Sequence, residues 1–187
     1  MVTMFTTMLS FANEVSFFTI KNDAEKTSLT LENVKEGNLL SIKDDHGVTL
    51  YKELILKAGI YTKGFDLTSL PNGDYIFELD QDVEINTIPF SVKSNTVAFN
   101  KELEKTIFKP LVMVKDDIAY ITKLSLNETP LQIDIFYTEA IDYELVYSEK
   151  IENTQNISRI FKLTDLKKGS YKMVFHTEDR VFSEIVN

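Results

Sequence analysis

Side chains that could do chemistry are scarce in this chain of 187 residues. It has two histidines, His46 and His176, and no cysteine. The lack of cysteine excludes thiol nucleophiles, disulfides and thiolate zinc sites, and two distant histidines do not form a multi-histidine metal site. Neither histidine has a neighbouring base and orienting group, which acid–base catalysis needs, so we expect both to be solvated.

Catalytic and cofactor motifs are also missing. The sequence contains no Gly-x-Ser-x-Gly nucleophile elbow and no His-Glu-x-x-His zinc motif, and six glycines are too few for a phosphate cradle. We therefore predict that the protein is not an enzyme and has no cofactor. Its net charge of -9 argues against nucleic acid as a partner, because phosphates would meet a surface of the same sign.

Three carboxylates at alternate positions are the candidate metal ligands. Asp80, Asp82 and Glu84 offer the oxygen atoms that calcium prefers. The segment lacks the twelve-residue loop with a central glycine, and the corresponding positions 176–179 of the second half are different. A solvated acidic hairpin is the competing interpretation.

Two binding surfaces of other kinds are also candidates. Tyr61, Tyr137 and Tyr143 lie outside the repeated pattern described below, and exposed tyrosine rings can stack on sugars, although the chain has no tryptophan. The closing segment Arg180–Val186 is expected to be an edge strand, to which a partner strand could add by backbone pairing.

A repeated pattern organises the elements that would position these residues. The frame Phe-x-Leu-Thr-x-Leu-x-x-Gly-x-Tyr begins at Phe65 and again at Phe161, 96 positions later, and Tyr51 and Tyr147 keep the same offset. Six matched positions in one frame, with the tyrosine pair as a seventh at the same offset, predict two copies of one domain. We expect a first domain at 13–94, a short and fairly stiff linker at 95–100, and a second domain at 101–187.

Hydrophobic residues alternate with polar ones nearly throughout, which predicts strands rather than helices. One face of the segment Asp74–Leu79 carries Tyr75, Phe77 and Leu79, and Ser170–Phe175 repeats the pattern. Turn residues such as Pro71-Asn72-Gly73 separate the segments. Roughly seven short strands in each copy predict an all-β protein, a tandem of two immunoglobulin- or fibronectin-III-like β-sandwiches related by internal duplication.

The repeated frame has a structural explanation in such a sandwich. The tyrosine buries its ring and bonds its hydroxyl back to the loop, as in a tyrosine corner, while the leucine plugs the core and the glycine adopts a backbone angle that a Cβ would oppose. We therefore predict structural roles for six residues: Tyr75, Tyr171, Gly73, Gly169, Leu70 and Leu166.

Residues 1–12 have the character of a signal peptide. They are uncharged and apolar and end in Ser10-Phe11-Ala12, with small residues at the positions that a signal peptidase reads. The basic start of a signal peptide is missing, so we expect a truncated signal peptide whose true start lies upstream; a short apolar strand is the alternative. No later segment has the roughly 18 apolar residues of a membrane helix, which predicts a soluble mature chain.

These features together resemble small secreted immunoglobulin-like domains of unknown function that are common in Bacteroidetes. The resemblance rests on the hairpin segment Leu40–Tyr51 followed by Phe65-Asp66-Leu67-Thr68-Ser69-Leu70-Pro71-Asn72-Gly73-Asp74-Tyr75. The same pattern is similar to that of the C-terminal sorting domains of type IX secretion cargo. Two departures are that the pattern occurs twice, when only one copy can be the tail, and that we expect no passenger domain before it. The second copy departs from the pattern at Lys167-Lys168.

The resemblance implies a fold and export, and it assigns no site. We predict a non-catalytic binding or assembly module of the cell envelope that is secreted, periplasmic or at the cell surface. Its partner is expected to be another envelope or secreted protein. A glycan- or calcium-binding accessory protein is the alternative.

Overall fold

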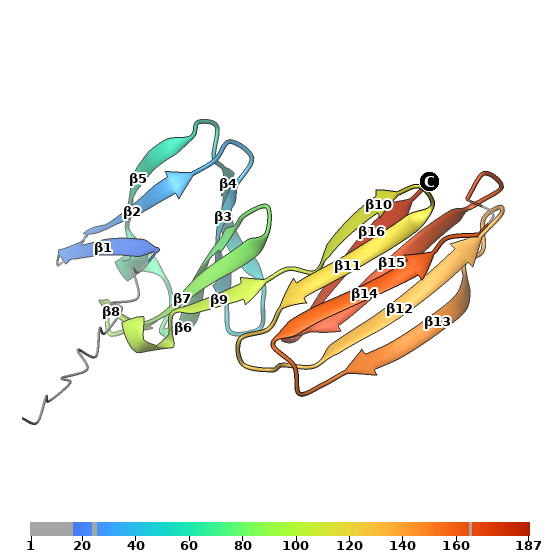
Figure 1. Ribbon diagram of the computed structural model, residues 1–187. Helices are drawn as coiled ribbons and strands as arrows, with labels where there is room; N and C mark the ends of the chain where they lie inside the picture. Colours follow the sequence, from blue (N-terminus) through green and yellow to red (C-terminus); the bar gives the residue numbers. More distant parts are fainter. Residues whose placement is uncertain (1–16, 24–25, 165) are drawn as a thin grey trace, which may run out of the picture.

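The computed structural model describes residues 17–187 except 24–25 and 165, and it is built of β-strands (Figure 1). The predicted signal peptide at 1–12 lies outside the described residues. No helix in the described part of the chain is long and apolar enough to cross a membrane. The strands of the first half are β1 (Phe18–Asp23), β2 (Lys26–Val34), β3 (Leu39–Asp44), β4 (Thr49–Leu54), β5 (Gly59–Phe65), β6 (Gly73–Asp80), β7 (Glu84–Lys93), β8 (Thr96–Phe99) and β9 (Lys105–Phe108).

The second half has seven strands of its own. These are β10 (Leu111–Lys115), β11 (Ile118–Leu124), β12 (Leu131–Thr138), β13 (Glu144–Ile151), β14 (Asn156–Lys162), β15 (Ser170–Thr177) and β16 (Arg180–Val186). They form a three-stranded sheet, β10-β11-β14, and a four-stranded sheet, β13-β12-β15-β16, and all pairs are antiparallel.

The first half has the same topology. Its sheets run β1-β2-β5 and β4-β3-β6-β7, so that each strand of one half has a counterpart in the other. Strands β8 and β9 are additions to the second of these sheets. The predicted all-β class is confirmed, with two sheets of immunoglobulin type in each half. The common topology is what a duplication would produce; the duplication itself stays a prediction.

Each half buries a core between its two sheets because side chains on alternate positions point inward. Buried and less buried residues alternate along β12 and β15, as the sequence predicted. In the first core, Phe77 is fully buried and packs against the rings of Phe65, Phe90 and Phe99, with centroids 5.2, 5.3 and 6.1 Å away. Two separate clusters of buried residues thus support two sandwiches.

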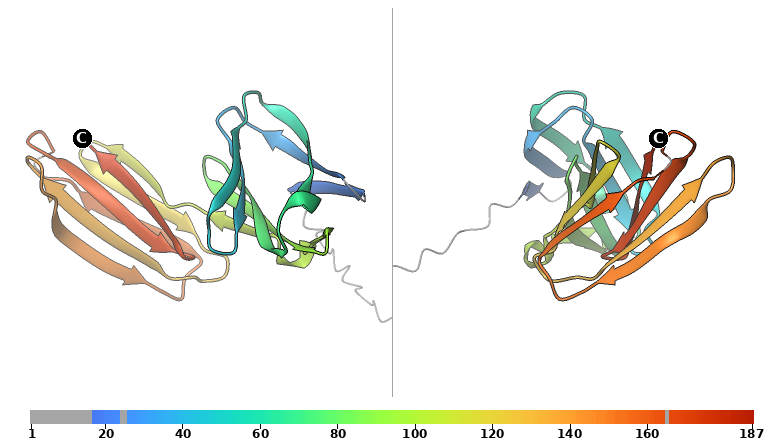
Figure 2. Two further views of the ribbon diagram at one scale, coloured as in Figure 1. Left: turned by 180° about the vertical axis from the view of Figure 1, so that it is seen from behind. Right: turned by 45° about the vertical axis from the view of Figure 1, so that its right-hand side comes forward.

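The expected linker at 95–100 differs from the structure. Residues Thr96–Phe99 form β8, which pairs with the C-terminal part of β7, and β9 pairs with the N-terminal part of the same edge. The chain passes from one set of sheets to the other between β9 and β10 (Figures 1 and 2). The expected boundary failed because the apolar residues Val97 and Phe99 serve the first core: Val97 is buried and Phe99 packs against Phe90.

Candidate functional site

The two repeated tyrosines form the hydrogen bonds of a tyrosine corner. Both rings are buried, and the Tyr75 hydroxyl donates to the carbonyl oxygen of Pro71 at 2.8 Å. In the second half, the Tyr171 hydroxyl donates to the carbonyl oxygen of Thr164 at 2.7 Å. Each bond ties the loop before the strand to the strand itself, which is a structural role and leaves neither hydroxyl free for chemistry.

Removing either hydroxyl is expected to destabilise its own half. Tyr75→Phe and Tyr171→Phe keep the ring but leave a loop carbonyl without its donor, which should lower the free energy of unfolding by about 1 kcal/mol each. Urea titrations followed by tyrosine fluorescence and circular dichroism measure this change. As a control, Tyr120→Phe removes a hydroxyl from the other sheet of the second half and should be close to neutral; an equal loss in all three variants would contradict the role.

The two repeated glycines do not have the backbone conformation that the sequence analysis expected. Positive φ angles occur at Gly37, Gly47 and Gly59, and neither Gly73 nor Gly169 is among them. At Gly169 the constraint is instead a close approach: a Cβ would lie 2.1 Å from the carbonyl oxygen of Thr138. At Gly73 the nearest atom would be the Tyr75 hydroxyl oxygen at 3.4 Å, so the two glycines are not equivalent.

The leucine that plugs each core is the first leucine of the frame. Leu67 and Leu163 are each 3% exposed, whereas Leu70 and Leu166 are only partly buried against the same cores. The frame alone did not distinguish them, since both leucines recur at the same offset. In the first half the buried leucine begins the short 3-10 helix Leu67–Ser69, in which it is the buried residue.

The candidate calcium ligands bind cations of the chain itself. Asp80 pairs with Lys109 at 2.5 Å and Asp82 pairs with Lys35 at 3.0 Å, both beside the β6–β7 turn. Glu84 accepts a hydrogen bond from the Asn86 amide. The three carboxylates therefore have separate partners, and the structure does not gather them into one ligand set.

Among the described residues, acidic and histidine side chains gather within ligand distance of one another at Asp44, Asp45 and His46. There the Asp44 carboxylate accepts hydrogen bonds from the backbone N–H groups of His46 and Val48 at 3.0 and 2.8 Å. These bonds shape the β3–β4 turn, which is the usual reason for aspartate at such a position. The turn therefore explains why these three side chains lie close together.

The second histidine lies in an arrangement that superficially resembles a catalytic triad. Its Nε2 atom is 3.6 Å from Asp134, and Asp134 also accepts a hydrogen bond from the Ser148 hydroxyl at 2.7 Å. In this chain the carboxylate stands between serine and histidine, so the imidazole is not placed to take the hydroxyl proton. The side chain of His176 is 49% exposed and that of His46 is 81% exposed, so both histidines meet solvent.

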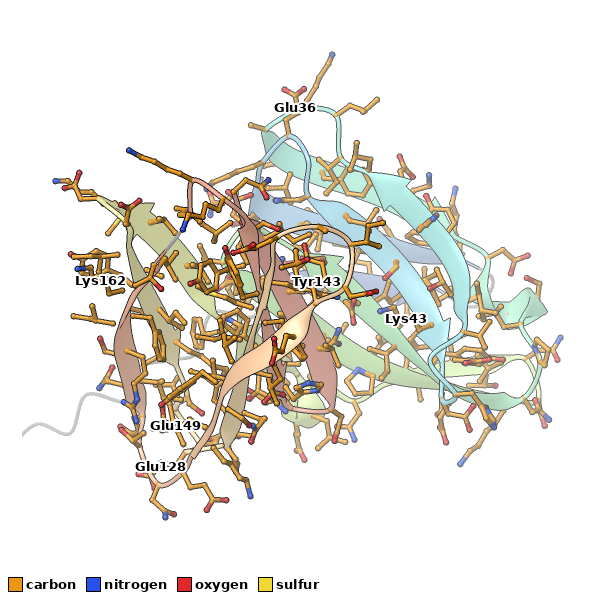
Figure 3. All side chains as sticks on the ribbon, turned by 90° about the vertical axis from the view of Figure 1, so that its right-hand side faces the viewer. Glu36, Lys43, Glu128, Tyr143, Glu149 and Lys162 are labelled. Atoms are coloured by element: carbon orange, nitrogen blue, oxygen red, sulfur yellow. The ribbon has the colours of Figure 1, made fainter. Side chains whose placement is uncertain are left out.

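The three candidate sugar-stacking tyrosines have different surroundings. Tyr61 packs against the first core, where burial and the neighbouring Glu53 carboxylate raise its pKa. Tyr137 packs against Tyr171, with ring centroids 4.9 Å apart. Tyr143, beside β13, is 39% exposed, and Lys172 lies 6.0 Å from its ring centroid (Figure 3). One exposed ring with a cation over it does not make a stacking platform.

A second repeated cluster joins the two sheets of each sandwich. In the second half, Arg159 of β14 binds Glu149 of β13 through two nitrogens, at 2.9 and 2.7 Å, and the Tyr147 hydroxyl donates to the same carboxylate at 3.0 Å. Glu149 and Tyr143 mark opposite ends of this edge strand in Figure 3. Arg159 keeps the pKa of Glu149 below its ordinary value of 4.5.

The first half carries the same cluster at positions 96 earlier. Lys63 of β5 and the Tyr51 hydroxyl both donate to Glu53 of β4, and a phenylalanine two positions after each basic residue packs edge-on against each tyrosine. The repeat indicated the two tyrosines, whereas the two basic residues were not predicted. The offset could have found them, because Lys63-Gly-Phe65 and Arg159-Ile-Phe161 align in the repeat.

We expect Glu149→Gln to lower the free energy of unfolding by about 1 kcal/mol at pH 7, since the pair is charge-assisted but partly exposed. The folded-state pKa of Glu149 is lowered, so the pair contributes above the ordinary value of 4.5 and is lost as pH falls through the folded-state pKa. The difference between variant and wild type should therefore shrink in urea titrations at pH 3. Glu152→Gln, from an exposed pair with Lys150, is the control; a loss from it equal to that of Glu149→Gln would contradict this prediction.

Ion pairs also connect the two sandwiches. The β15–β16 turn brings Arg180 to within 2.5 Å of Glu78 on β6, and Glu178 of the same turn binds Lys105 on β9 at 2.7 Å. Glu78 also binds Lys43 at 2.7 Å, and its own side chain is 6% exposed. Burial raises the pKa of Glu78, but the two cations outweigh it, so the pKa lies below the ordinary value.

Beside this contact lies a groove of about 570 Å³ with walls from both halves, including Val83, Phe108, Leu111 and Leu124. Its two lysines are already paired. Lys109 binds Asp80, and the fully buried Lys123 lies 3.4 Å from Glu178, while burial lowers the pKa of Lys123. The groove therefore presents neutralised cations and a mainly apolar wall.

The two halves differ at the edge of the larger sheet. In the first half, β7 is covered by β8 and β9, and β8 also reaches the other sheet, because the Asn22 amide donates to the carbonyl oxygen of Val97 at 2.9 Å. In the second half the counterpart of β7 is β16, which has a neighbour only in β15 among the described strands. Strand β16 lies next to β10 of the other sheet (Figures 1 and 2), where Val114 is 37% exposed.

Strand β16 carries Arg180 and Glu184 but no lysine, the side chain that most often keeps a sheet edge from pairing. Every other edge strand of more than four residues in the described part of the chain carries a lysine, which discourages pairing. The β15–β16 register runs without a bulge, and Val181 and Ile185 on its outer face are 64% and 54% exposed. The lysines of the other edges are Lys21 (β1), Lys52 (β4), Lys63 (β5), Lys115 (β10), Lys150 (β13) and Lys162 (β14).

Known proteins resemble this chain only distantly. No family model and no curated protein matches it. Solved structures that align with it include the CupB2 chaperone of Pseudomonas aeruginosa, at 10% identity over 87% of this chain and 92% of the other, with a TM-score of 0.24. Others are α-2-macroglobulin domains MG0-NIE-MG1 from Escherichia coli (14% identity, 91% and 69% coverage, TM-score 0.25) and the FN1–FN3 domains of chicken CNTN1 (13% identity, 92% and 67% coverage, TM-score 0.22). Similarity at this level assigns no function.

Proposed function

We propose that this protein is a non-catalytic, exported binding or assembly module of the cell envelope, and that it binds its partner by strand addition at the β16 edge. The observation that carries the proposal is the contrast between two counterpart strands: the outer edge of β7 is covered by β8 and β9, whereas that of β16 pairs with no other strand in the described part of the chain. A free edge offers a row of backbone N–H and C=O groups, and a partner strand gains affinity by pairing with them.

The first half indicates what kind of segment fits such an edge. Strand β8 is extended and alternates, so that Val97 and Phe99 turn toward the core while their neighbours stay exposed. A partner strand of the same alternating kind could pair with β16 and cover Val114 on the neighbouring edge. We therefore expect the partner segment to be apolar at every second residue.

Export is the second part of the proposal. It is supported by the uncharged, apolar residues 1–12 with Ser10 and Ala12 at the positions read by a signal peptidase. A tandem of β-sandwiches with exposed edges also suits a binding role outside the cytoplasm. The type IX sorting-domain resemblance is part of the same proposal and concerns export alone.

Position-specific cross-linking in native cells tests both parts. A photoreactive benzoylphenylalanine replaces Ser183 on β16 in one variant and Thr49, which is also exposed but lies on the lysine-bearing edge β4, in the control. We expect a cross-linked product in the envelope or secreted fraction from position 183 and none from position 49. Equal products from both positions, or recovery of uncleaved protein from the cytosol alone, would overturn the proposal.

The glycan- or calcium-binding alternative makes a different prediction. A ligand that binds only the folded protein raises its melting temperature. Calcium or a glycan that shifts the melting temperature, with the shift lost in Asp82→Asn for calcium or Tyr143→Ala for a glycan, would favour the alternative. The separate ion pairs of Asp80 and Asp82 give no support to a shared calcium site.

A further inference from the structure

We propose that the strand which pairs with β16 is the β16 strand of a second copy of this chain, running antiparallel across a two-fold axis at Ser183. This inference rests on the proposed function, because it names the partner for the same edge. The two four-stranded sheets would then form one continuous sheet of eight strands.

The free backbone groups of β16 are arranged symmetrically about Ser183. Thr177 pairs with Arg180 across a two-residue turn, Glu178-Asp179, in which both residues have positive φ. The two residues that flank such a turn form backbone hydrogen bonds with each other. Along the strand, residues that hydrogen-bond to this neighbour then alternate with residues whose backbone groups point the other way. Arg180 therefore bonds toward β15, and the N–H and C=O groups of Val181, Ser183 and Ile185 face the open edge.

Antiparallel pairing centred on Ser183 uses all of these groups. Ser183 of one copy lies opposite Ser183 of the other, and Val181 lies opposite Ile185. In each strand, all three residues whose backbone groups face the open edge then lie opposite residues of the same kind. A register shifted by one residue places backbone groups that face the open edge opposite groups that face β15. A register centred on Phe182 leaves Ile185 opposite a turn residue.

The same register covers the exposed apolar side chains of the strand. Val181 and Ile185 are on the outer face of the sheet, since their partners on β15 are the outward residues His176 and Lys172. They are 64% and 54% exposed, and the two-fold axis brings each against the other. Apolar side chains opposite each other on one face favour pairing. The β16 strand of a second copy therefore supplies the apolar side chains that cover Val181 and Ile185, without a different protein.

The charges predict how this dimer responds to salt. Each chain has a net charge of -9, so the two copies repel each other. Arg180 keeps its partner Glu78 in the proposed register, and Glu184 lies opposite Phe182 rather than opposite a second carboxylate. Because salt screens the overall repulsion, we expect association to become tighter from roughly 0.05 to 0.5 M salt.

Sedimentation equilibrium and single-cysteine variants of the full chain test the dimer and its register. The native chain has no cysteine, so Ser183→Cys introduces a single thiol. Across a two-fold axis at this position the Cα atoms would lie about 5.5 Å apart, within the range of a disulfide. In Val181→Cys the two thiols would be displaced by four residues, roughly 13 Å along the strand, and no disulfide should form.

The expected result is a mass that rises from 21.5 kDa toward twice that value with concentration, together with a disulfide in Ser183→Cys and none in Val181→Cys. Ser183→Pro removes an N–H group that faces the open edge and should return the mass to that of the monomer with an unchanged circular dichroism spectrum. Ser183→Lys should have the same effect because a lysine on an edge strand discourages pairing, and it serves as the second variant if proline perturbs the fold.

Contrary outcomes separate this inference from the proposed function. A monomer at millimolar concentration that forms no Ser183→Cys disulfide would overturn the inference, and a cross-link from position 183 to a different protein would leave the proposed function standing. A dimer that survives both Ser183→Pro and Ser183→Lys, or that oxidises equally through Val181→Cys, would also overturn it, because another surface or register would then hold the copies together.

Discussion

Gly169→Ala is expected to destabilise the second sandwich by about 3 kcal/mol, whereas Gly73→Ala should change the stability of the first by no more than about 0.5 kcal/mol. The methyl group at position 169 would lie 2.1 Å from the carbonyl oxygen of Thr138 and 2.8 Å from the Tyr137 hydroxyl oxygen. The first of these atoms belongs to the backbone of β12, so the strand or the loop must move to make room.

The glycine pair is a matched control within one molecule. Both glycines precede the corner tyrosine by two positions, and at position 73 the nearest atom to a new methyl group would be the Tyr75 hydroxyl oxygen at 3.4 Å. Urea titration of each variant gives the free energy of unfolding, and Met173 and Phe77 amide signals in an NMR spectrum identify which core is loosened. Equal effects at both positions would contradict the proposed cause, since a shared backbone requirement would then be responsible.

Glu78→Gln is expected to lower the free energy of unfolding by about 2 kcal/mol and to loosen the contact between the two sandwiches. The variant keeps the shape of the side chain but removes the negative charge that both Arg180 and Lys43 contact. Two partly buried cations then lie together without a carboxylate. The cost is held below that of a fully buried pair because the Arg180 and Lys43 side chains are 26% and 28% exposed.

The pH dependence of this contact has a defined sign. The folded-state pKa of Glu78 is lower than its ordinary value of 4.5, so its contribution is present above that value and lost as pH falls through the folded-state pKa. Small-angle scattering should show a larger radius of gyration for Glu78→Gln at pH 7, and wild type should approach the variant near pH 3.

Asp82→Asn is the control for Glu78→Gln. It breaks an ion pair whose side chains are 62% and 70% exposed, and it should have an effect below about 0.5 kcal/mol and no effect on the radius of gyration. If Glu78→Gln changes neither the free energy of unfolding nor the radius of gyration, the contact between the sandwiches does not depend on this carboxylate.

Local features of the fold could be predicted because they depend on neighbouring residues. Alternation along β12 and β15 and the turn residues between strands each act over a few positions. The offset of 96 extended these predictions to both halves and led to the hydrogen bonds of Tyr75 and Tyr171. The same offset also contained Lys63 and Arg159, which were overlooked because their importance depends on a carboxylate in the opposite sheet.

Other predictions failed where spatial neighbours decided the outcome. Gly169 is constrained by the Thr138 carbonyl of a distant strand, and residues 96–99 of the expected linker form β8 because Val97 and Phe99 complete the first core. Asp80 and Asp82 bind lysines at positions 109 and 35, so the alternate carboxylates did not form a ligand set. Charge partners cannot be read from spacing along the chain when they arrive from other strands.

The sequence by itself determined the all-β class, the repeat, the corner tyrosines and the absence of cysteine chemistry, since these depend on residue type and local period. Only the tertiary structure decided which sheet edges are covered and which are open, and that Arg180 reaches Glu78, 102 positions earlier in the chain. The reason is physical: β7 and β16 occupy equivalent places in their sheets, and whether an edge is free depends on whether another segment of the folded chain lies against it.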